Sequence, residues 1–309
     1  MKTTILLPLH RSHRWKSALI DQVRELQQVA ELVVSDATEN DDTLAALRGE
    51  FGDAPRITWL GRRPLADGWR AHANDLIGHV STPYLMWHSH DDHIGVDWIT
   101  AAEAVLEEKR DVVAACGPVR SFDDVEPARR LVLDVPSFVE LSDSRERIAA
   151  ALAALLSGRP ADLGVLYRSV VRTSAVRPLP PGITDDQYSD VLWALSLVER
   201  GPIGRMDAWY TKRWHADSAH SQWTTWDARS PALREILINQ LSTADLQTVV
   251  DAWTVDASLF NAAIESVRLE ERASAAAALA SLRDDFERSR SWRITAPFRR
   301  RATGRRPSS

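Results

Sequence analysis

The sequence has 309 residues, of which 44% are hydrophobic and 26% are charged, with a formal net charge of −5 and a single cysteine, Cys116. A chain of this length can bury the core of one large or two smaller domains. The acidic balance argues against a nucleic-acid-binding protein, because duplex binding draws on an excess of positive charge. One cysteine excludes an internal disulfide and suits a reducing compartment. The N-terminal apolar run is too short for a signal segment, and no run reaches the roughly 18 apolar residues of a membrane span, so we expect a cytoplasmic protein.

The first 120 residues alternate between short apolar runs and amphipathic patterns. Strands that alternate with helices are typical of βαβ units, and hence of a mostly parallel sheet covered on both faces. Ligands bind beyond the carboxyl ends of such strands. Strands are expected over residues 3–9, 31–37, 56–61, 83–88 and 111–119, and helices over residues 17–29, 42–51, 68–80 and 97–109. Four loops should therefore meet at one edge of the sheet: residues 8–14, 35–42, 61–72 and 88–93.

After residue 120 the pattern is less regular. Helices are expected over 144–158 and 189–201, with a turn at 178–182, and the chain reads as helical from about residue 230. Helically spaced apolar residues near 263–290 are typical of a packing helix or of helical self-association. From Arg288 to Arg306 there are eight arginines and no acid. This segment either contacts an anionic membrane surface or is a solvated terminus.

The segment His88–His93 reads HSHDDH and directly follows an expected strand. Asp91 and Asp92 offer hard oxygen ligands, which suit Mg²⁺ or Mn²⁺ bound together with phosphate oxygens. The three histidines instead suggest a zinc site, and a plain polar loop is the third interpretation. Adjacent strand positions point to opposite faces, so these side chains converge only if the loop turns sharply.

The segment VVSDATENDDT, residues 33–43, places Asp36 at the end of another expected strand. There its carboxylate can accept hydrogen bonds from a nucleobase or ribose, although Asp, Thr and Asn are also common turn and N-cap residues. The first strand is followed by LHRSHR, which lacks a glycine-rich phosphate loop. A dinucleotide enzyme or a P-loop NTPase is therefore disfavoured.

A third cluster of polar residues lies downstream. Asp185, Asp186 and Asp190 precede or open an expected helix, where carboxylates are favoured by the helix dipole whatever their role. One of them is also placed to act as a general base on an acceptor hydroxyl.

The segment YTKRWH, residues 210–215, follows this helix. Lys212 and Arg213 carry charges that can neutralise a diphosphate, and His215 is a candidate for a metal or a phosphate, although lone histidines are more often structural. Trp87, Trp98 and Trp214 are candidates for stacking on a sugar, with Trp98 favoured as a core residue.

Taken in order, these motifs resemble family 2 glycosyltransferases with the GT-A fold. The segment ILLPLHRS is similar to the opening strand and loop of that family, and LVVSDATENDDT resembles its VVDDGSTDDT element. The segment GWRAHANDLI resembles the family's G-x-x-x-x-x-N helix, with Gly68 and Asn74 matching. The segment YLMWHSHDDHIGVDWI resembles the metal-binding D-x-D element in the form found in an "HDD" subgroup. Ser89 and His90 replace the acid that many members carry there.

The resemblance implies an α/β protein of the GT-A class, with a mixed, mostly parallel sheet flanked by helices and a helical C-terminal extension. It implies a nucleotide-sugar-binding half over residues 1–120, an acceptor-side half over 121–229, a helical region over 230–290 and a basic tail over 291–309. The implied activity is metal-dependent, inverting sugar transfer from a nucleoside diphosphate sugar, by default a UDP-sugar, to a hydroxyl of a glycan or lipid-linked glycan. The implied place is the cytoplasm or the inner face of the membrane.

The resemblance also assigns roles to residues. The general base is Asp190, with Asp186 as the alternative, and Mn²⁺ or Mg²⁺ is held by Asp91 or Asp92 and His215. The nucleotide sugar is bound by residues from all the motifs, namely Pro8, His10, Arg11, Asp36, Gly68, Arg70, Asn74, His90, Asp91, Lys212 and Arg213. His72 is a weaker candidate for the same role.

Two other classes of function remain compatible with the sequence. One is a non-catalytic nucleotide-sugar- or glycan-binding protein, which the missing first acid of the D-x-D element favours. The other is a metal-dependent hydrolase built on the cluster of histidines from His88 to His93.

Overall fold

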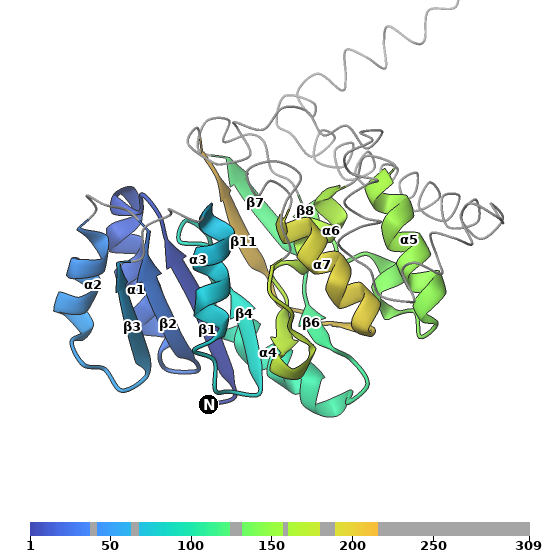
Figure 1. The fold of residues 1–309 in the computed structure, drawn as a ribbon, viewed down its shortest axis with the longest axis horizontal. Helices are drawn as coiled ribbons and strands as arrows, with labels where there is room; N and C mark the ends of the chain where they lie inside the picture. Colours follow the sequence, from blue (N-terminus) through green and yellow to red (C-terminus); the bar gives the residue numbers. More distant parts are fainter. Residues whose placement is uncertain (38–41, 63–67, 124–131, 157–159, 180–188, 216–309) are drawn as a thin grey trace, which may run out of the picture.

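The protein is described from a computed structural model, which describes residues 1–37, 42–62, 68–123, 132–156, 160–179 and 189–215 (Figure 1). The helices expected beyond residue 230, the self-association segment at 263–290, the tail at 291–309 and Asp186 lie outside the described residues. Within these residues, no helix combines the length and the apolar character needed to cross a membrane.

The centre of the molecule is a seven-stranded sheet with the strand order β10-β6-β9-β4-β1-β2-β3. Only β9 runs antiparallel to its neighbours, β4 and β6, whereas the other pairs are parallel. The mixed, mostly parallel sheet expected from the sequence is therefore confirmed. Its strands are β1 (Thr3–Leu9), β2 (Glu31–Asp36), β3 (Ile57–Arg62), β4 (Tyr84–Trp87), β6 (Ala114–Cys116), β9 (Val170–Arg172) and β10 (Ile203–Arg205).

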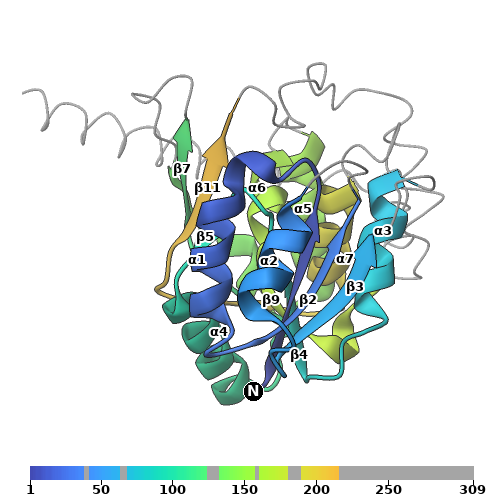
Figure 2. The same ribbon diagram turned by 90° about the vertical axis from the view of Figure 1, so that its left-hand side faces the viewer.

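Helices cover both faces of this sheet, with α1 and α4 on one side and α3 and α7 on the other (Figure 2). Coverage on both faces explains why β1 is an almost unbroken apolar run with nearly every residue buried. The helices are α1 (Lys16–Leu26), α2 (Thr43–Phe51), α3 (Gly68–Ile77), α4 (Val96–Glu108), α5 (Ser144–Leu156), α6 (Pro160–Leu166) and α7 (Ser189–Arg200), with short 3-10 helices η1 (His13–Trp15), η3 (Ser137–Glu140) and η4 (Thr173–Ala175).

A second, four-stranded sheet has the order β5-β11-β7-β8. Its strands are β5 (His93–Ile94), β7 (Val119–Asp123), β8 (Val132–Leu133) and β11 (Tyr210–Trp214). β11 pairs with β5 in antiparallel register, so that Thr211 lies opposite His93. This pairing brings the YTKRWH segment beside the HSHDDH segment, although they are far apart in the sequence.

The single strand expected over residues 111–119 is divided between the two sheets. β6 ends at Cys116 and β7 begins at Val119, with Gly117 and Pro118 between them. A Cβ atom on Gly117 would lie 2.2 Å from the carbonyl oxygen of Ala208. The chain therefore changes sheets at a position where only glycine fits.

Candidate functional site

Asp91 and His215 form a close polar pair at the carboxyl edge of the strands. Asp91 lies in the turn that follows β4, and His215 directly follows β11. The His215 Nε2 atom lies 3.0 Å from Asp91 Oδ2, and the side chains are 8% and 18% exposed, respectively. Burial alone would raise the pKa of Asp91, but the hydrogen bond from His215 and the charge of His90 lower this pKa to about 2. Asp91 is thus held as an ionised carboxylate.

Asp92 is the next residue, but it contacts a different set of groups. The Tyr210 hydroxyl donates a hydrogen bond to Asp92 Oδ2 at 2.9 Å, and the backbone N–H of Arg213 donates to Oδ1 at 2.9 Å. Arg168 Nη2 lies 3.7 Å from Oδ2. Burial and the neighbouring charge of Asp91 raise the pKa of Asp92. Asp92 therefore ties the turn after β4 to β11.

Two basic side chains lie beside these acids, of which Arg168 is buried and Lys212 is half-buried. The Arg168 guanidinium lies 5.1 Å from the centre of the Tyr210 ring, and its Nη1 donates to the carbonyl oxygen of Gly164 at 2.6 Å. Lys212 lies on the same strand face as Tyr210, because residues two apart on a strand share a face. Burial and the charge of Arg168 lower the pKa of Lys212 to about 8, although three acids, including Asp91, oppose this shift. The site thus holds positive charge in a place suited to an anionic ligand.

Asp190 opens α7 and is placed by the first turn of that helix. Burial raises its pKa, whereas the charges of Lys212 and Arg168 act in the opposite direction. Within the described part of the chain, its buried Oδ1 atom has no hydrogen-bond partner. The Asp190 carboxylate therefore has one oxygen atom available as an acceptor, and it lies close enough to Lys212 for the charge of Lys212 to lower its pKa.

The expected nucleoside-binding residues lie at the ends of β1 and β2. Pro8 is paired in register with Ser35, and Asp36 is fully buried at the end of β2. The Ser35 hydroxyl is hydrogen-bonded to Nε2 of His72, a residue of α3. His10 donates its backbone N–H to Ser12 Oγ at 3.1 Å. These contacts place β1, β2 and α3 around one corner of the sheet.

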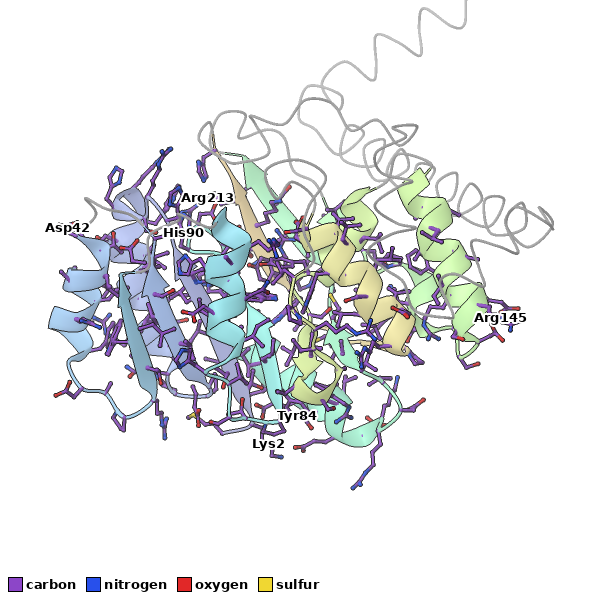
Figure 3. The ribbon with its side chains drawn as sticks, in the orientation of Figure 1. Lys2, Asp42, Tyr84, His90, Arg145 and Arg213 are labelled. Carbon is purple, nitrogen blue, oxygen red and sulfur yellow. The ribbon has the colours of Figure 1, made fainter. Side chains whose placement is uncertain are left out.

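Arg11 has a φ angle of 51° in the loop after β1. This left-handed conformation is uncommon for a residue other than glycine and turns the chain sharply between β1 and η1. Figure 3 shows His90 and Arg213 at the same end of the molecule, with Lys2 and Tyr84 at the opposite end of the strands.

Asn74 is engaged with the protein backbone. Its Nδ2 donates to the carbonyl oxygen of Leu179 at 3.1 Å, and the backbone N–H of Leu179 donates to its Oδ1 at 2.6 Å. The Trp193 indole N–H of α7 donates to the carbonyl oxygen of Arg177 at 3.0 Å. The segment from Arg177 to Leu179 is therefore attached to both α3 and α7. Gly68 begins α3, and Arg70 is half-buried in its first turn.

The three histidines of the HSHDDH segment do not meet in one place. His88 is buried, with its Nδ1 3.5 Å from the Tyr210 hydroxyl, and His93 is exposed in β5. Burial and the charge of His93 lower the pKa of His88 to about 3. Among the described residues, no three His, Cys, Asp or Glu side chains are grouped so that they could hold a metal ion. This finding argues against a zinc centre built on the histidines. Asp91 and His215 are then a pair of candidate metal ligands without a third.

That pair fits a metal of the Mg²⁺ or Mn²⁺ type. Such ions take octahedral ligands at about 2.1 Å, so two neighbouring ligand atoms lie ~3 Å apart. The Asp91 Oδ2 and His215 Nε2 atoms, here joined by a hydrogen bond, lie 3.0 Å apart, so both would reach one such ion if Nε2 gave up its proton to coordinate it. Two protein ligands are also typical for Mg²⁺, whose remaining coordination positions are filled by water and substrate phosphates.

Three residues of this site were missed from the sequence alone. Arg168 and Tyr210 surround Asp92, and Trp15 contacts Arg213 and His215. Arg168 follows α6 and carried no motif. Tyr210 could have been found from the segment YTKRWH, because Tyr210 and Lys212 are two positions apart on a strand and so share a face.

Trp98 fills the core, as expected from the sequence. Its side chain is fully buried, and its ring lies 5.5 Å from that of Tyr210. Trp87 is also buried and is stacked on Tyr167 at 6.1 Å.

Comparison with known proteins shows the fold. No family model matches the sequence, and no curated protein matches it. Among solved structures, S. aureus TarS 1-349 in complex with UDP-GlcNAc matches with a TM-score of 0.54 at 14% identity, over 85% of this chain and 79% of that chain. TarS 1-349 in complex with UDP matches with a TM-score of 0.50 at 14% identity, over 83% and 75% of the two chains.

A further TarS structure matches with a TM-score of 0.52 at 14% identity, over 81% of this chain and 42% of that chain. This chain thus spans less than half of that TarS chain. Together with the observed sheet order, these likenesses show that the chain has the GT-A fold.

Proposed function

We propose that this protein is a metal-dependent glycosyltransferase that moves a sugar from a nucleoside diphosphate sugar to a hydroxyl of a glycan or lipid-linked glycan. The observation that carries the proposal is the Asp91–His215 pair, 3.0 Å apart at the carboxyl edge of a GT-A sheet. Half-buried Lys212 and buried Arg168 lie on the neighbouring side. The TarS structures with UDP and UDP-GlcNAc, which share the fold, support a uridine nucleotide as the first donor to test.

The nucleoside is bound at the corner formed by β1, β2 and α3. The buried carboxylate of Asp36 accepts hydrogen bonds from the base or ribose, and the loop from Pro8 to Arg11 lies beside it. Arg70 and His90 reach the donor from α3 and the turn after β4. Gly68 keeps the start of α3 clear of the donor. These roles follow the position of each residue around one corner of the sheet.

The diphosphate is bound between Asp91 and β11. Asp91 and His215 would hold Mn²⁺ or Mg²⁺ there, which supplies Lewis-acid stabilisation of the departing nucleoside diphosphate. Lys212 and Arg213 contribute positive charge on the same strand. Asp92 holds β11 in place through Tyr210 and the backbone of Arg213, so we assign it a positioning role beside the metal.

Asp190 deprotonates the acceptor hydroxyl. Its raised pKa makes it a stronger base than an ordinary aspartate, and its Oδ1 lacks a partner among the described residues. The acceptor oxygen then attacks the anomeric carbon as the bond to the nucleoside diphosphate breaks, and a single displacement inverts that carbon. Asp186, which lies outside the described residues, is the alternative base.

Several partners complete the proposal. The acceptor is a glycan or a lipid-linked glycan, and the Arg-rich segment at 291–309 provides peripheral contact with the inner face of the membrane. Residues 263–290 are the proposed self-association segment. The proposed place of action is the cytoplasm.

A titration with nucleotide sugars tests the proposal. Binding of UDP or a UDP-sugar that requires Mn²⁺ or Mg²⁺, followed by turnover with an acceptor panel, is the expected result. Binding without turnover across the panel would favour a non-catalytic binding protein. If no nucleoside diphosphate binds in the presence of Mn²⁺ or of Mg²⁺, the proposal is refuted. Zinc that stays bound through purification at one ion per chain would favour a metal-dependent hydrolase.

A further inference from the structure

Trp15 lies at the junction between the donor loop and the proposed metal ligands. Its ring centre is 4.8 Å from the Arg14 guanidinium carbon and 4.6 Å from that of Arg213. The His215 ring lies 5.2 Å away and is tilted by 55°. Trp15 itself is only 8% exposed, at the end of η1. The Trp15 indole thus contacts Arg14, its neighbour in η1, as well as Arg213 and His215 at the end of β11.

The geometry of β11 explains why these two residues meet the same ring. Arg213 and His215 are two positions apart, and side chains with that spacing face the same side of an extended chain. Tyr210 and Lys212 have the other parity, and they face Asp92 and Arg168. β11 therefore has one side directed to Trp15 and one side directed to the buried charges.

Trp15 restricts His215 in addition to its hydrogen bond with Asp91. The Asp91 carboxylate binds Nε2 at 3.0 Å, whereas Trp15 packs against the ring. A cation over an aromatic face is attracted by the ring quadrupole, so Trp15 also fixes the Arg213 guanidinium. A metal ligand that two neighbouring side chains already hold in place loses less conformational freedom when the metal binds.

We propose that Trp15 is a positioning residue that holds His215 and Arg213 ready for a divalent metal and a diphosphate. The inference rests on the proposed function, because it takes Asp91 and His215 as the metal pair. It adds a coupling between the β1 loop and the metal site. Trp15 reaches the metal only through His215 and is not itself in contact with it.

The test compares Trp15→Leu with the wild-type protein in a Mn²⁺ titration followed by electron paramagnetic resonance, with and without UDP. Losing the indole should weaken Mn²⁺ binding roughly tenfold or more, the range typical of residues that support a metal ligand. Trp15→Phe keeps an aromatic face and should weaken it by about threefold. The second variant also decides the question if Trp15→Leu does not fold.

Trp59 provides a matched control. It is a half-buried tryptophan with an arginine, Arg48, 5.8 Å from its ring centre, but it lies on the edge strand β3. Trp59→Leu should leave Mn²⁺ binding at the wild-type level. Equal Mn²⁺ affinity in Trp15→Leu, Trp59→Leu and the wild type would overturn the inference, as would wild-type affinity in Trp15→Phe if Trp15→Leu does not fold. No Mn²⁺-dependent UDP binding by the wild type would instead refute the proposed function.

Discussion

The Nε2 atom of His215 lies 3.0 Å from the Oδ2 atom of Asp91, and 124 positions of sequence separate these residues. Antiparallel pairing of β5 with β11 carries His215 to the turn that holds Asp91. Their contact therefore joins two parts of the chain that are far apart in the sequence.

The contacts of Asp92 predict a role distinct from that of Asp91. Tyr210→Phe removes the hydroxyl that donates to Asp92 Oδ2 but keeps the ring. Leaving a buried carboxylate oxygen without this donor should lower the free energy of unfolding by about 1–3 kcal/mol in urea titrations. Mn²⁺-dependent UDP binding should weaken less than in Asp91→Asn.

Tyr84→Phe is the control for this experiment, since Tyr84 lies buried at the opposite end of the strands (Figure 3). Its free energy of unfolding should change less. Equal losses in the two variants would show that the hydrogen bond to Asp92 contributes little.

Asp190 is expected to act in transfer and not in donor binding. Asp190→Asn keeps the shape of the side chain but removes the basic oxygen. The dissociation constant for UDP with Mn²⁺ should stay within about twofold of the wild-type value, while transfer to an acceptor falls by at least ~100-fold. Calorimetry and a UDP-release assay measure the two quantities. Loss of UDP binding in Asp190→Asn, together with retained UDP binding and lost transfer in Asp91→Asn, would show that the roles of the two residues are exchanged.

Lys212 gives the site a dependence on pH. Burial and the charge of Arg168 lower its pKa from the ordinary 10.5 to about 8, so it loses its proton as the pH rises through about 8. Only the protonated form attracts a diphosphate. UDP affinity should therefore fall between pH 7 and pH 9, and binding at pH 8.5 should take up a proton.

Calorimetry with Mg²⁺ in two buffers of different ionisation enthalpy measures that uptake. Lys212→Met removes the titrating group. The UDP affinity of this variant should be lower than that of the wild type at pH 7 and should not fall further near pH 8. The same decrease in Lys212→Met would assign it to another group.

Asn74, which the sequence predicted to bind the nucleotide sugar, is bonded to Leu179, so we expect it to act by holding the segment from Arg177 to Leu179 in place. Asn74→Ala removes both hydrogen bonds to Leu179 and should lower the free energy of unfolding by ~1–3 kcal/mol. Transfer should slow while the dissociation constant for UDP remains unchanged. Asn74→Asp keeps the acceptor for the N–H of Leu179 and should lose less stability. A large loss of UDP affinity with normal stability would instead make Asn74 a donor contact.

The sequence predicted the fold best where an apolar run was long and clearly bounded. The strand Thr3–Leu9 was predicted with the same bounds, because a run buried on both faces is almost wholly apolar. β9 spans only Val170–Arg172 and lies within an apolar stretch that has no clear period. The division at Gly117 depends on the close approach of Ala208, a contact that no local pattern reveals.

The site was predictable as a set of chemical groups but not as a set of contacts. Paired acids after a strand indicated Asp91 and Asp92, yet the different contacts of the two acids depend on how β11 pairs beside them. Trp15 follows a basic loop and resembles an ordinary core residue in the sequence. Its role depends on Arg213 and His215, which reach it only through the second sheet.

The most direct test of the account is calorimetric titration of UDP into the protein with and without Mn²⁺, for the wild type, Asp91→Asn and His215→Gln. The wild type should bind UDP only with the metal, and each substitution should weaken that binding by ~10–100-fold or more. His79→Gln, at an exposed position just after the end of α3, is the matched control and should bind as the wild type does. Unchanged Mn²⁺-dependent binding in both Asp91→Asn and His215→Gln would contradict the central claim.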